Sequence, residues 1–337
     1  MKPYYADDWL TVYLGDCREV MATMEPESVH CVVTSPPYWG LRDYGNAGQL
    51  GLEPTPEAYV ANMVAVFREV RRVLRADGTV WLNLGDSYAA ERGGTHQPAE
   101  TLAGGRHGKT ADGERVNRGR ADSYSPTRNA RGIGLKHKDL VGIPWRVAFA
   151  LQADGWYLRS DIIWAKPNPM PESVTDRPTK SHEYLFLLSK SARYYFDADA
   201  VREEGVNPAN RMPGRGMTKT THYHPSNGGN EGLLALRNRL NDEGSAAMSR
   251  NIRSVWTIAT QPYLGAHFAT FPRKLVEPCI KAGCPTLGTV LDPFAGSGTT
   301  GMVAQSLSRR AVLIDLNADY LGQAMDRNRD IPMGLGA

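Results

Sequence analysis

The sequence contains little cysteine, and its few cysteines are poorly spaced for a metal site or a disulfide framework. Only four of the 337 residues are cysteines, and no two of them form a C-x-x-C pair. Cys279 and Cys284 are separated by four residues and have no nearby pair of histidines, so the spacing argues against zinc. We therefore expect no metal, and reduced thiols of the kind found in cytosolic proteins.

The sequence also lacks a long hydrophobic run. No apolar stretch approaches the roughly 18 residues that a transmembrane helix needs, and the N-terminal ten residues contain no signal-peptide core. We expect a soluble, cytoplasmic protein without a membrane partner. Hydrophobic residues still make up 41% of the chain, which is enough for a substantial core.

A strong excess of charge of one sign is missing as well. The formal net charge is only +3, so the overall charge does not by itself indicate a nucleic-acid-binding protein. Basic side chains outnumber acidic ones within residues 89–136, a segment rich in Gly, Arg, Ser, Asn and Thr. This segment fits either a solvated linker or a loop that folds around a polyanion. Residues 203–253 are also polar and fit a second insertion or a small recognition module.

Outside these polar segments, apolar patterns predict alternating strands and helices. Thr55 can cap a helix, Pro56 suits its first position, and apolar residues recur at helical spacing as far as Leu74. Strands are expected at 10–14, 29–33, 79–84, 157–164, 183–188, 289–291 and 311–314, with 194–196 pairing with 183–188 in a hairpin. Helices are expected at 17–23, from 55 to about 74, and at 143–153, 273–277, 299–307 and 318–328.

A glycine-rich turn follows the strand expected at 289–291. Gly296, Gly298 and Gly301 match G-x-G-x-x-G, and Asp315 follows the next expected strand about 20 residues later. Glycines let the backbone approach a ligand closely, and an acidic residue at that distance can bind ribose hydroxyls. The pattern predicts a nucleotide-like cofactor, either NAD or S-adenosylmethionine (SAM). Only about 36 residues follow Gly301, so most of the sheet must come from earlier in the chain, in permuted order.

Two motifs together carry a resemblance to a known family. Residues 292–299, Asp-Pro-Phe-Ala-Gly-Ser-Gly-Thr, combined with residues 35–38, Ser-Pro-Pro-Tyr, resemble the amino-group DNA methyltransferases. The order, with Ser-Pro-Pro-Tyr first, is similar to the beta arrangement of that family. Further blocks agree, at residues 14–17, 83–86, 163–168 and 266–272.

The resemblance implies a fold, a cofactor and partners. The expected fold is α/β, a SAM-dependent methyltransferase Rossmann-like sheet that is mostly parallel, with helices on both faces, permuted motif order and polar insertions. The implied methyl donor is SAM, and the implied substrate is double-stranded DNA in a bacterial host, for a bacterial or a phage protein. A cognate restriction endonuclease is compatible with this assignment, and the oligomeric state is left open.

The resemblance also divides the chain and assigns site residues. The expected parts are a catalytic half at 1–88 that continues at 141–202, a basic insertion at 89–140, a target-recognition insertion at 203–255, and a SAM-binding half at 256–337. The implied catalytic residues are Ser35, Pro36, Pro37 and Tyr38. The implied cofactor-binding residues are Asp16, Asp292, Pro293, Phe294, Gly296, Gly298, Thr299 and Asp315, with Asp16 toward the adenine and Asp315 toward the ribose.

The chemistry of amino methylation suits these residues. An exocyclic amine is a poor nucleophile because its lone pair is delocalised into the ring, so an enzyme must hold it close to the methyl donor. By resemblance, the Ser35 hydroxyl and the Pro36 carbonyl accept its two N–H groups, and the two prolines stiffen the loop. Tyr38 offers an aromatic face to a base taken out of the duplex. Trp39 either extends that face or packs in the core, and the corner at residues 166–168 is expected to shape the base pocket.

The first residue of the catalytic motif bears on the target base. In the family that this chain resembles, Ser is usual in cytosine-N4 enzymes, and Asp or Asn is usual in adenine-N6 enzymes. Ser35 therefore favours N4 of cytosine, with N6 of adenine as the alternative.

Other classes of protein explain only part of these sequence features. A cytosine-C5 methyltransferase needs a cysteine nucleophile, and the Pro278-Cys279 pair follows an expected helix rather than a catalytic strand. Methylation of RNA or of a protein amide is another option, because a related Pro-Pro-Tyr motif serves those planar amines too. The basic insertions favour a nucleic acid over a protein. The permuted order argues against an NAD-dependent oxidoreductase, and a non-catalytic DNA-binding module would leave the Pro-Pro corner unexplained.

Overall fold

The computed structural model describes residues 1–41, 48–90, 134–204, 249–261, 271–329 and 331. These residues form two units, one made of 1–197 and 254–337 and the other of 198–253. The larger unit contains both motifs. Part of the expected insertions and most of the 266–272 block lie outside the described residues.

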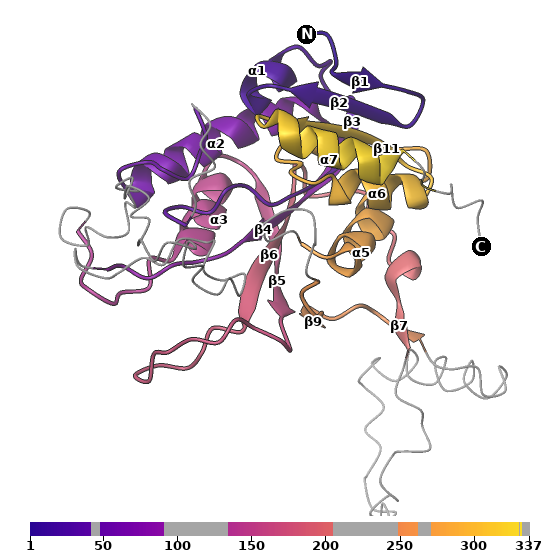
Figure 1. Ribbon diagram of the computed structural model, residues 1–337. Coiled ribbons are helices and arrows are strands. Elements are labelled where there is room, and N and C mark those ends of the chain that lie inside the picture. The colour runs from indigo at the N-terminus through magenta and orange to yellow at the C-terminus, as the bar shows by residue number, and fades with distance from the viewer. Residues whose placement is uncertain (42–47, 91–133, 205–248, 262–270, 330, 332–337) are drawn as a thin grey trace, which may run out of the picture. The chain divides into compact units, whose positions relative to one another are not determined.

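A nine-stranded sheet is the frame of the larger unit, in the order β1-β2-β11-β10-β3-β4-β6-β5-β9 (Figure 1). The strands are β1 (Tyr5–Ala6), β2 (Leu10–Leu14), β3 (Val29–Thr34), β4 (Leu74–Leu84), β5 (Tyr157–Ala165), β6 (His182–Ser189), β9 (Val255–Thr257), β10 (Thr289–Asp292) and β11 (Arg310–Asp315). The five strands β2, β11, β10, β3 and β4 are mutually parallel. β6 is antiparallel to both β4 and β5, and β1 is antiparallel to β2.

The two central strands, β10 and β3, come from distant parts of the chain and are joined by a histidine side chain as well as by their pairing. β3 is a continuous apolar run with Val29, Cys31, Val32 and Val33 buried, as expected for a strand covered on both faces. The His30 Nδ1 atom accepts a hydrogen bond of 3.0 Å from the Thr289 backbone N–H, at the start of β10. Burial lowers the pKa of His30, which favours the neutral imidazole that this bond requires.

Three helices pack together on one face of the sheet. They are α1 (Cys17–Ala22), α2 (Pro56–Val73) and α3 (Ile143–Ala153). In α2 the Thr55 side chain accepts from the Ala58 backbone N–H, and Pro56 occupies the first turn, so the predicted helix start is confirmed. Its apolar residues at helical spacing, including Tyr59, Met63 and Phe67, are fully buried.

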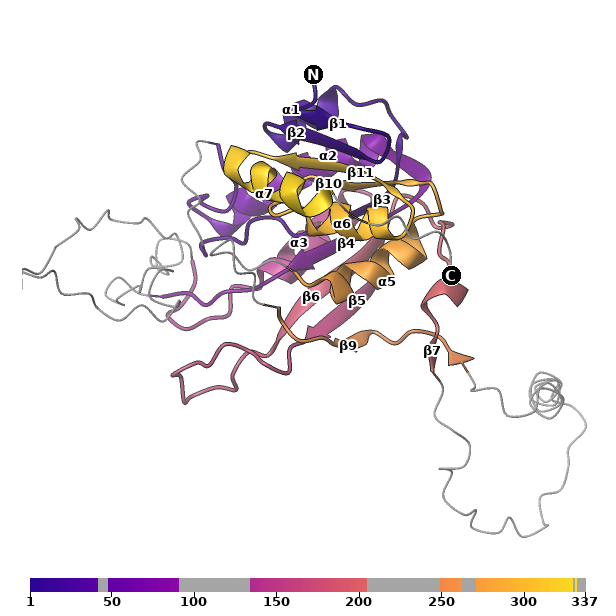
Figure 2. The same ribbon diagram turned by 45° about the vertical axis from the view of Figure 1, so that its right-hand side comes forward.

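Three further helices, α5 (Arg273–Gly283), α6 (Thr299–Ser306) and α7 (Ala318–Asn328), pack on the other face (Figure 2). The chain runs from β10 through α6 to β11 in one direction along the sheet, and from β3 through α2 to β4 in the other. The order therefore reverses between β10 and β3, and ligands of open α/β sheets bind at such a point, beyond the carboxyl ends of the strands. The mostly parallel, permuted α/β fold is confirmed.

Several local predictions were wrong or incomplete. Residues 194–196 form no strand, and the Tyr195 backbone N–H instead donates to the Asp77 carbonyl. Instead of pairing with that segment, β6 lies between β4 and β5 and is antiparallel to both. β4 begins at Leu74, directly at the end of α2, and the short strands β1 and β9 had no clear sequence signal.

The smaller unit contains a short 3-10 helix, η4 (Asp199–Val201), and the antiparallel strands β7 (Glu203–Glu204) and β8 (Ser249–Arg250). The Glu203 carboxylate accepts from the guanidinium groups of Arg250 and Arg253. Residues 205–248 lie outside the described residues, so a recognition role for 203–255 stays a prediction. Among the described residues, no helix has the length and apolar character needed to cross a bilayer.

Candidate active site

The two predicted motifs meet at the edge where the parallel strands end. β3 ends next to Ser35, β10 ends at Asp292, and β11 ends at Asp315. β2 ends beside β11, and the Gly15 backbone N–H donates to the Asp315 carbonyl at 3.0 Å. The topology therefore brings residues from both ends of the chain to the crevice where a ligand is expected.

The Ser-Pro-Pro-Tyr corner is fixed by the helix and loop behind it. The Tyr59 hydroxyl, on α2, donates to the Pro37 carbonyl at 2.9 Å. Trp39 is 1% exposed, and its indole N–H donates to the Glu53 carbonyl at 2.9 Å. Trp39 thus packs in the core and does not extend an aromatic face for a base, which decides between the two predictions made for it. The Pro36 carbonyl accepts no hydrogen bond from the described residues, although Pro36 itself is buried.

Tyr38 is partly exposed and lies against the end of β4. Its hydroxyl oxygen is 2.9 Å from Asn83 Oδ1 and 2.9 Å from Glu183 Oε2. Its ring packs on Gly85 so closely that a Cβ atom at residue 85 would lie 2.4 Å from Tyr38 Cε2. Glycine at this position therefore lets the ring sit directly on the backbone.

A polar cluster surrounds the Ser35 hydroxyl. Ser35 Oγ lies 3.2 Å from Asn83 Oδ1 and 3.3 Å from the Tyr38 hydroxyl oxygen. Asn83 Nδ2 donates to the Tyr184 carbonyl at 3.1 Å and approaches Glu183 Oε2 at 3.3 Å. Lys166 forms an ion pair with the other Glu183 oxygen.

Two members of this cluster were not predicted as site residues. Asn83 interrupts an otherwise apolar strand, in the run Val-Trp-Leu-Asn-Leu. Glu183 lies at the start of another, in the run His-Glu-Tyr-Leu-Phe. A buried polar side chain near the carboxyl end of a strand is a signal that could have indicated Asn83. Asp86, from the same block as Asn83, has a structural role: its carboxylate accepts from the backbone N–H groups of Gly142 and Ile143 and caps α3.

The glycines of the predicted cofactor turn have different surroundings. Gly296 has a φ of +49°, and a Cβ atom there would meet nothing within 4 Å, so this part of the turn faces open space. At Gly298 a Cβ atom would lie 2.7 Å from the Ala324 Cβ atom, so this glycine lets α6 approach α7. Thr299 and Ser297 are buried and bonded to Arg327 Nη1.

The two aspartates assigned to the cofactor by resemblance are already engaged with the backbone. Asp315 accepts from the Gly296 and Asn317 backbone N–H groups, each at 2.8 Å. Asp16 caps α1 through the Arg18 backbone N–H at 2.8 Å and pairs with the Arg18 guanidinium, which lowers the pKa of Asp16. Because each carboxylate oxygen has two lone pairs, these contacts orient the carboxylates and leave acceptors for hydroxyl or amine groups.

Asp292 points into the protein. It is 1% exposed and accepts from the Thr34 and Thr300 hydroxyls, each at 2.7 Å, and from the Phe294 backbone N–H at 3.1 Å. Burial raises the pKa of Asp292 to about 6 despite these hydrogen bonds. The neighbouring Pro293 is buried as well. Asp292 therefore shapes the turn through its internal contacts.

The chemistry of these residues suits a nucleoside ligand such as SAM. Gly296 offers open backbone, and the Asp315 carboxylate, at the end of β11, is bonded to that turn and keeps spare acceptors. Asp16 follows the neighbouring strand β2. Acidic acceptors suit the ribose hydroxyls and the adenine amine, and a ligand without phosphates needs no basic group here.

The cysteine of the Pro278-Cys279 pair is not placed for nucleophilic chemistry. Cys279 is fully buried inside α5, and its Sγ atom contacts the Leu275 carbonyl at 3.1 Å. Burial raises the pKa of this thiol well above its ordinary value, whereas the nucleophile of a C5 methyltransferase must become a thiolate. The structure therefore argues against that alternative.

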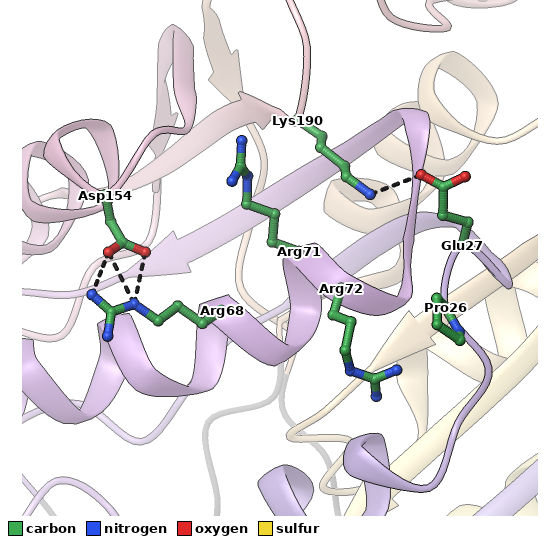
Figure 3. Close-up of a pocket in the computed structure, with 7 residues that line it drawn as sticks. All are labelled: Pro26, Glu27, Arg68, Arg71, Arg72, Asp154 and Lys190. Atoms are coloured by element: carbon green, nitrogen blue, oxygen red, sulfur yellow. Dashed lines mark hydrogen bonds and ion pairs between the residues drawn. The ribbon is translucent and has the colours of Figure 1, made fainter.

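A hollow of about 610 Å³ lies at the opposite edge of the sheet, where β3 begins and β6 ends (Figure 3). Four basic side chains line it, but most are paired within the protein. Arg68 forms three hydrogen bonds with Asp154, and Lys190 pairs with Glu27 at 3.0 Å. This cluster ties α2 to its neighbours and is remote from both motifs.

Comparison with known proteins gives a family. A family model described as DNA methylase, of the N6/N4 type, matches residues 29–326. The chain is 46% identical to the type II methyltransferase M.SmaI of Serratia marcescens, over 94% of this chain and 89% of that protein. It is 45% identical to M.XycI of Xanthomonas campestris pv. cyanopsidis, over 94% of this chain and 87% of that protein.

Solved structures show the same fold. The PvuII DNA methyltransferase, described as cytosine-N4-specific, is similar with a TM-score of 0.61 and 19% identity, covering 98% of this chain and 89% of that one. A putative DNA modification methylase of Thermus thermophilus, complexed with SAM, is similar with a TM-score of 0.55 and 22% identity, covering 95% and 94% of the two chains.

Proposed function

Because this chain belongs to the N6/N4 DNA methylase family, and is thus a SAM-dependent DNA amino-methyltransferase, we propose that it methylates N4 of cytosine at a specific site in double-stranded DNA. Family membership disfavours the NAD-dependent oxidoreductase that the glycine turn alone left open. The proposal concerns the base, the site residues and the way in which the base is reached.

The observation that carries the proposal is the pair of acceptors at the corner after β3. Ser35 Oγ lies in a cluster of acceptors, and the Pro36 carbonyl accepts no hydrogen bond from the described residues. Two acceptors on adjacent residues match the two N–H groups of one exocyclic amine. Held in this way, the nitrogen is oriented before reaction, and orientation of reactants is a major source of rate acceleration.

Each part of the site has a proposed role. SAM, when bound at the glycine turn, supplies an electrophilic methyl group. Asp315 and Asp16 hold its ribose and adenine, and the backbone at Gly296 allows close approach. Ser35 and Pro36 orient the amine, and Pro37 stiffens the corner with its carbonyl fixed by Tyr59.

Tyr38 bears on how the base enters. A base within a duplex cannot reach a crevice of this kind, so we infer that it is flipped out and stacks on the Tyr38 ring. Packing of the ring on Gly85 and bonding of its hydroxyl fix the plane on which the base would lie.

Methylation of adenine N6 is the second candidate. Ser35 favours cytosine by the resemblance described above, while the acceptor pair itself suits either amine. We also propose that the insertion at 203–255 reads the DNA sequence, and its deletion should abolish the sequence preference. Continued methylation of the same sites by the deletion variant would place recognition elsewhere.

Single-molecule sequencing of DNA from cells that express the protein tests the function. It reports the modified base and its sequence context together, and the Ser35→Ala variant is the control. N4-methylcytosine at one sequence with the native protein, and none with the variant, is the expected result. N6-methyladenine would select the second candidate, and an unmodified genome would refute both.

A further inference from the structure

Glu183 links the catalytic corner to an ion pair. It is the second residue of β6, which is antiparallel to β4, so it lies at the same edge as the carboxyl end of β4. One carboxylate oxygen pairs with Lys166, and the other is 2.9 Å from the Tyr38 hydroxyl and 3.3 Å from Asn83 Nδ2. The side chains of Lys166 and Glu183 are only 17% and 18% exposed, so the pair is largely shielded from water.

The Tyr38 hydroxyl has one proton and two oxygens at 2.9 Å, Asn83 Oδ1 and Glu183 Oε2. A carboxylate can only accept and is a stronger acceptor than an amide oxygen, so we assign the Tyr38 proton to Glu183 and the Asn83 Nδ2 contact as a donation to it. Asn83 Nδ2 gives its other proton to the Tyr184 carbonyl, which turns Oδ1 toward Ser35. The amide orientation is thus assigned by the network around it.

These directions determine where the Ser35 hydroxyl proton goes. With the Tyr38 proton directed to Glu183, both nearby groups, Tyr38 Oη and Asn83 Oδ1, face Ser35 as acceptors, at 3.3 and 3.2 Å. The single hydroxyl proton of Ser35 is therefore used inside the protein. Its oxygen lone pairs then remain for the N–H of an incoming amine, as the proposed function requires.

Removing the Glu183 carboxylate would change the directions of these hydrogen bonds. A glutamine at residue 183 carries an NH₂ group, which cannot satisfy Lys166, Tyr38 and Asn83 at once. The Tyr38 proton would then turn to Asn83 Oδ1 and compete with the Ser35 proton for that oxygen, leaving Ser35 the longer 3.3 Å contact with Tyr38 Oη. A Ser35 proton held this weakly is freer to turn toward the substrate. A donor facing an amine that can itself only donate is a mismatch at the reacting atom.

We propose that Glu183, anchored by Lys166, is a positioning residue that keeps Ser35 a hydrogen-bond acceptor for the exocyclic amine. This inference rests on the proposed function. It assigns the Glu183 carboxylate a role that neither motif contains, exerted through Tyr38 and Asn83 without contact to the substrate. The rival explanation is an ion pair that only stabilises the ends of β5 and β6.

A double-mutant cycle on the full-length protein separates the two. Single-turnover methylation would be measured for the native protein, Glu183→Gln, Tyr38→Phe and the double variant. The substrate is an unmethylated oligonucleotide that contains the sequence the native protein modifies. Tyr38→Phe keeps the aromatic face and removes only the hydroxyl. Each single change should slow methyl transfer by about 10- to 100-fold, since small misplacements at a reacting centre have effects of this size.

The pattern of effects is the decisive readout. If Glu183 acts through the Tyr38 hydroxyl, the double variant should be no slower than the slower single variant. The dissociation constants for SAM and for the oligonucleotide should stay within about twofold of native values. Glu27→Gln, which breaks a glutamate–lysine pair at the opposite edge of the sheet, is the matched control and should methylate at the native rate.

Several results would overturn the inference. Native rates for Glu183→Gln, or rate losses that multiply in the double variant, would show that Glu183 does not act through Tyr38. A loss in Glu183→Gln explained wholly by weaker SAM or DNA binding would indicate the ion-pair role. Failure of the native protein itself to methylate any DNA would instead refute the proposed function, and this inference with it.

Discussion

The Thr34 hydroxyl donates a hydrogen bond of 2.7 Å to the Asp292 carboxylate, across the boundary between β3 and β10. Thr34 immediately precedes the Ser-Pro-Pro-Tyr corner, and Asp292 begins the glycine turn. The bond therefore joins the two halves of the site directly, at the point where the strand order reverses. Both residues are 1% exposed, so this contact is shielded from water.

Replacing Thr34 by valine should destabilise the protein. The change keeps the shape of the side chain but leaves a buried carboxylate with one donor fewer, which costs about 1–3 kcal/mol. The free energy of unfolding measured in urea would show the loss. Thr257→Val, at an exposed position of β9, is the control and should change stability by less than about 0.5 kcal/mol. Equal effects of the two changes would contradict a structural role for this bond.

The buried Asp292 should make stability depend on pH in an unusual direction. Its pKa of about 6 in the folded protein lies above the ordinary value of 3.8, so the folded state binds the proton more tightly than the unfolded state. This contribution to stability is full below about pH 4 and is lost as pH rises through about 6. Between pH 7 and pH 5 it should grow by about 1 kcal/mol.

The comparison that isolates this effect is with Asp292→Asn, because other groups titrate in the same range. His30 is one of them, and its lowered pKa acts in the opposite sense. Urea unfolding at several pH values should give the native protein a more favourable change toward low pH than the variant. Parallel curves would show that Asp292 does not titrate in this window.

Gly85→Ala should impair methyl transfer through Tyr38. A Cβ atom would lie 2.4 Å from Tyr38 Cε2, so the ring must move away from β4. We expect single-turnover methylation to slow by about 10- to 100-fold, with SAM affinity unchanged. Gly322→Ala is the control, because a Cβ atom there meets nothing within 4 Å and alanine favours a helix interior by about 0.5–1 kcal/mol. Native activity in both variants would show that the packing of Tyr38 on Gly85 is not needed for methyl transfer.

Asp315→Ala should weaken SAM binding. The carboxylate holds the Gly296 and Asn317 backbone N–H groups, and its loss removes both these bonds and the acceptors proposed for the ribose. Hydrogen bonds to charged groups contribute about 1.5–3 kcal/mol, so the dissociation constant should rise by about 10- to 100-fold. Isothermal titration calorimetry measures this directly, with the exposed Asp319→Ala on α7 as the control. An unchanged constant would refute the assignment.

Much of the parallel part of the fold could be predicted from the sequence because its signals are local. The run Val-His-Cys-Val-Val and the Thr55-Pro56 start of α2 each specify an element by themselves. The glycine turn and the Ser-Pro-Pro-Tyr corner have distinctive chemistry and both follow strands. Parallel strands place such turns at one edge, so the meeting of the two motifs could be expected as well.

The parts that could not be predicted depend on contacts between distant segments. Asn83 and Glu183 are 100 residues apart, and their contact follows from the antiparallel register of β4 and β6. No local pattern encodes that register, and the wrong hairpin at 194–196 has the same origin. Trp39 was ambiguous because an aromatic residue beside a site suits either a substrate face or the core, and only its bond to Glu53 decides.

β2, near the start of the chain, pairs with β11, the last strand of the sheet to be made. A ribosome makes β3 and its Ser-Pro-Pro-Tyr corner early, but β10 and β11 are among the last strands to emerge. Until they do, β3 has no neighbour on one side, and the glycine turn proposed to hold the methyl donor has not been made. We therefore expect a chain that ends before β10 to be inactive, because it lacks the turn on which SAM is proposed to bind.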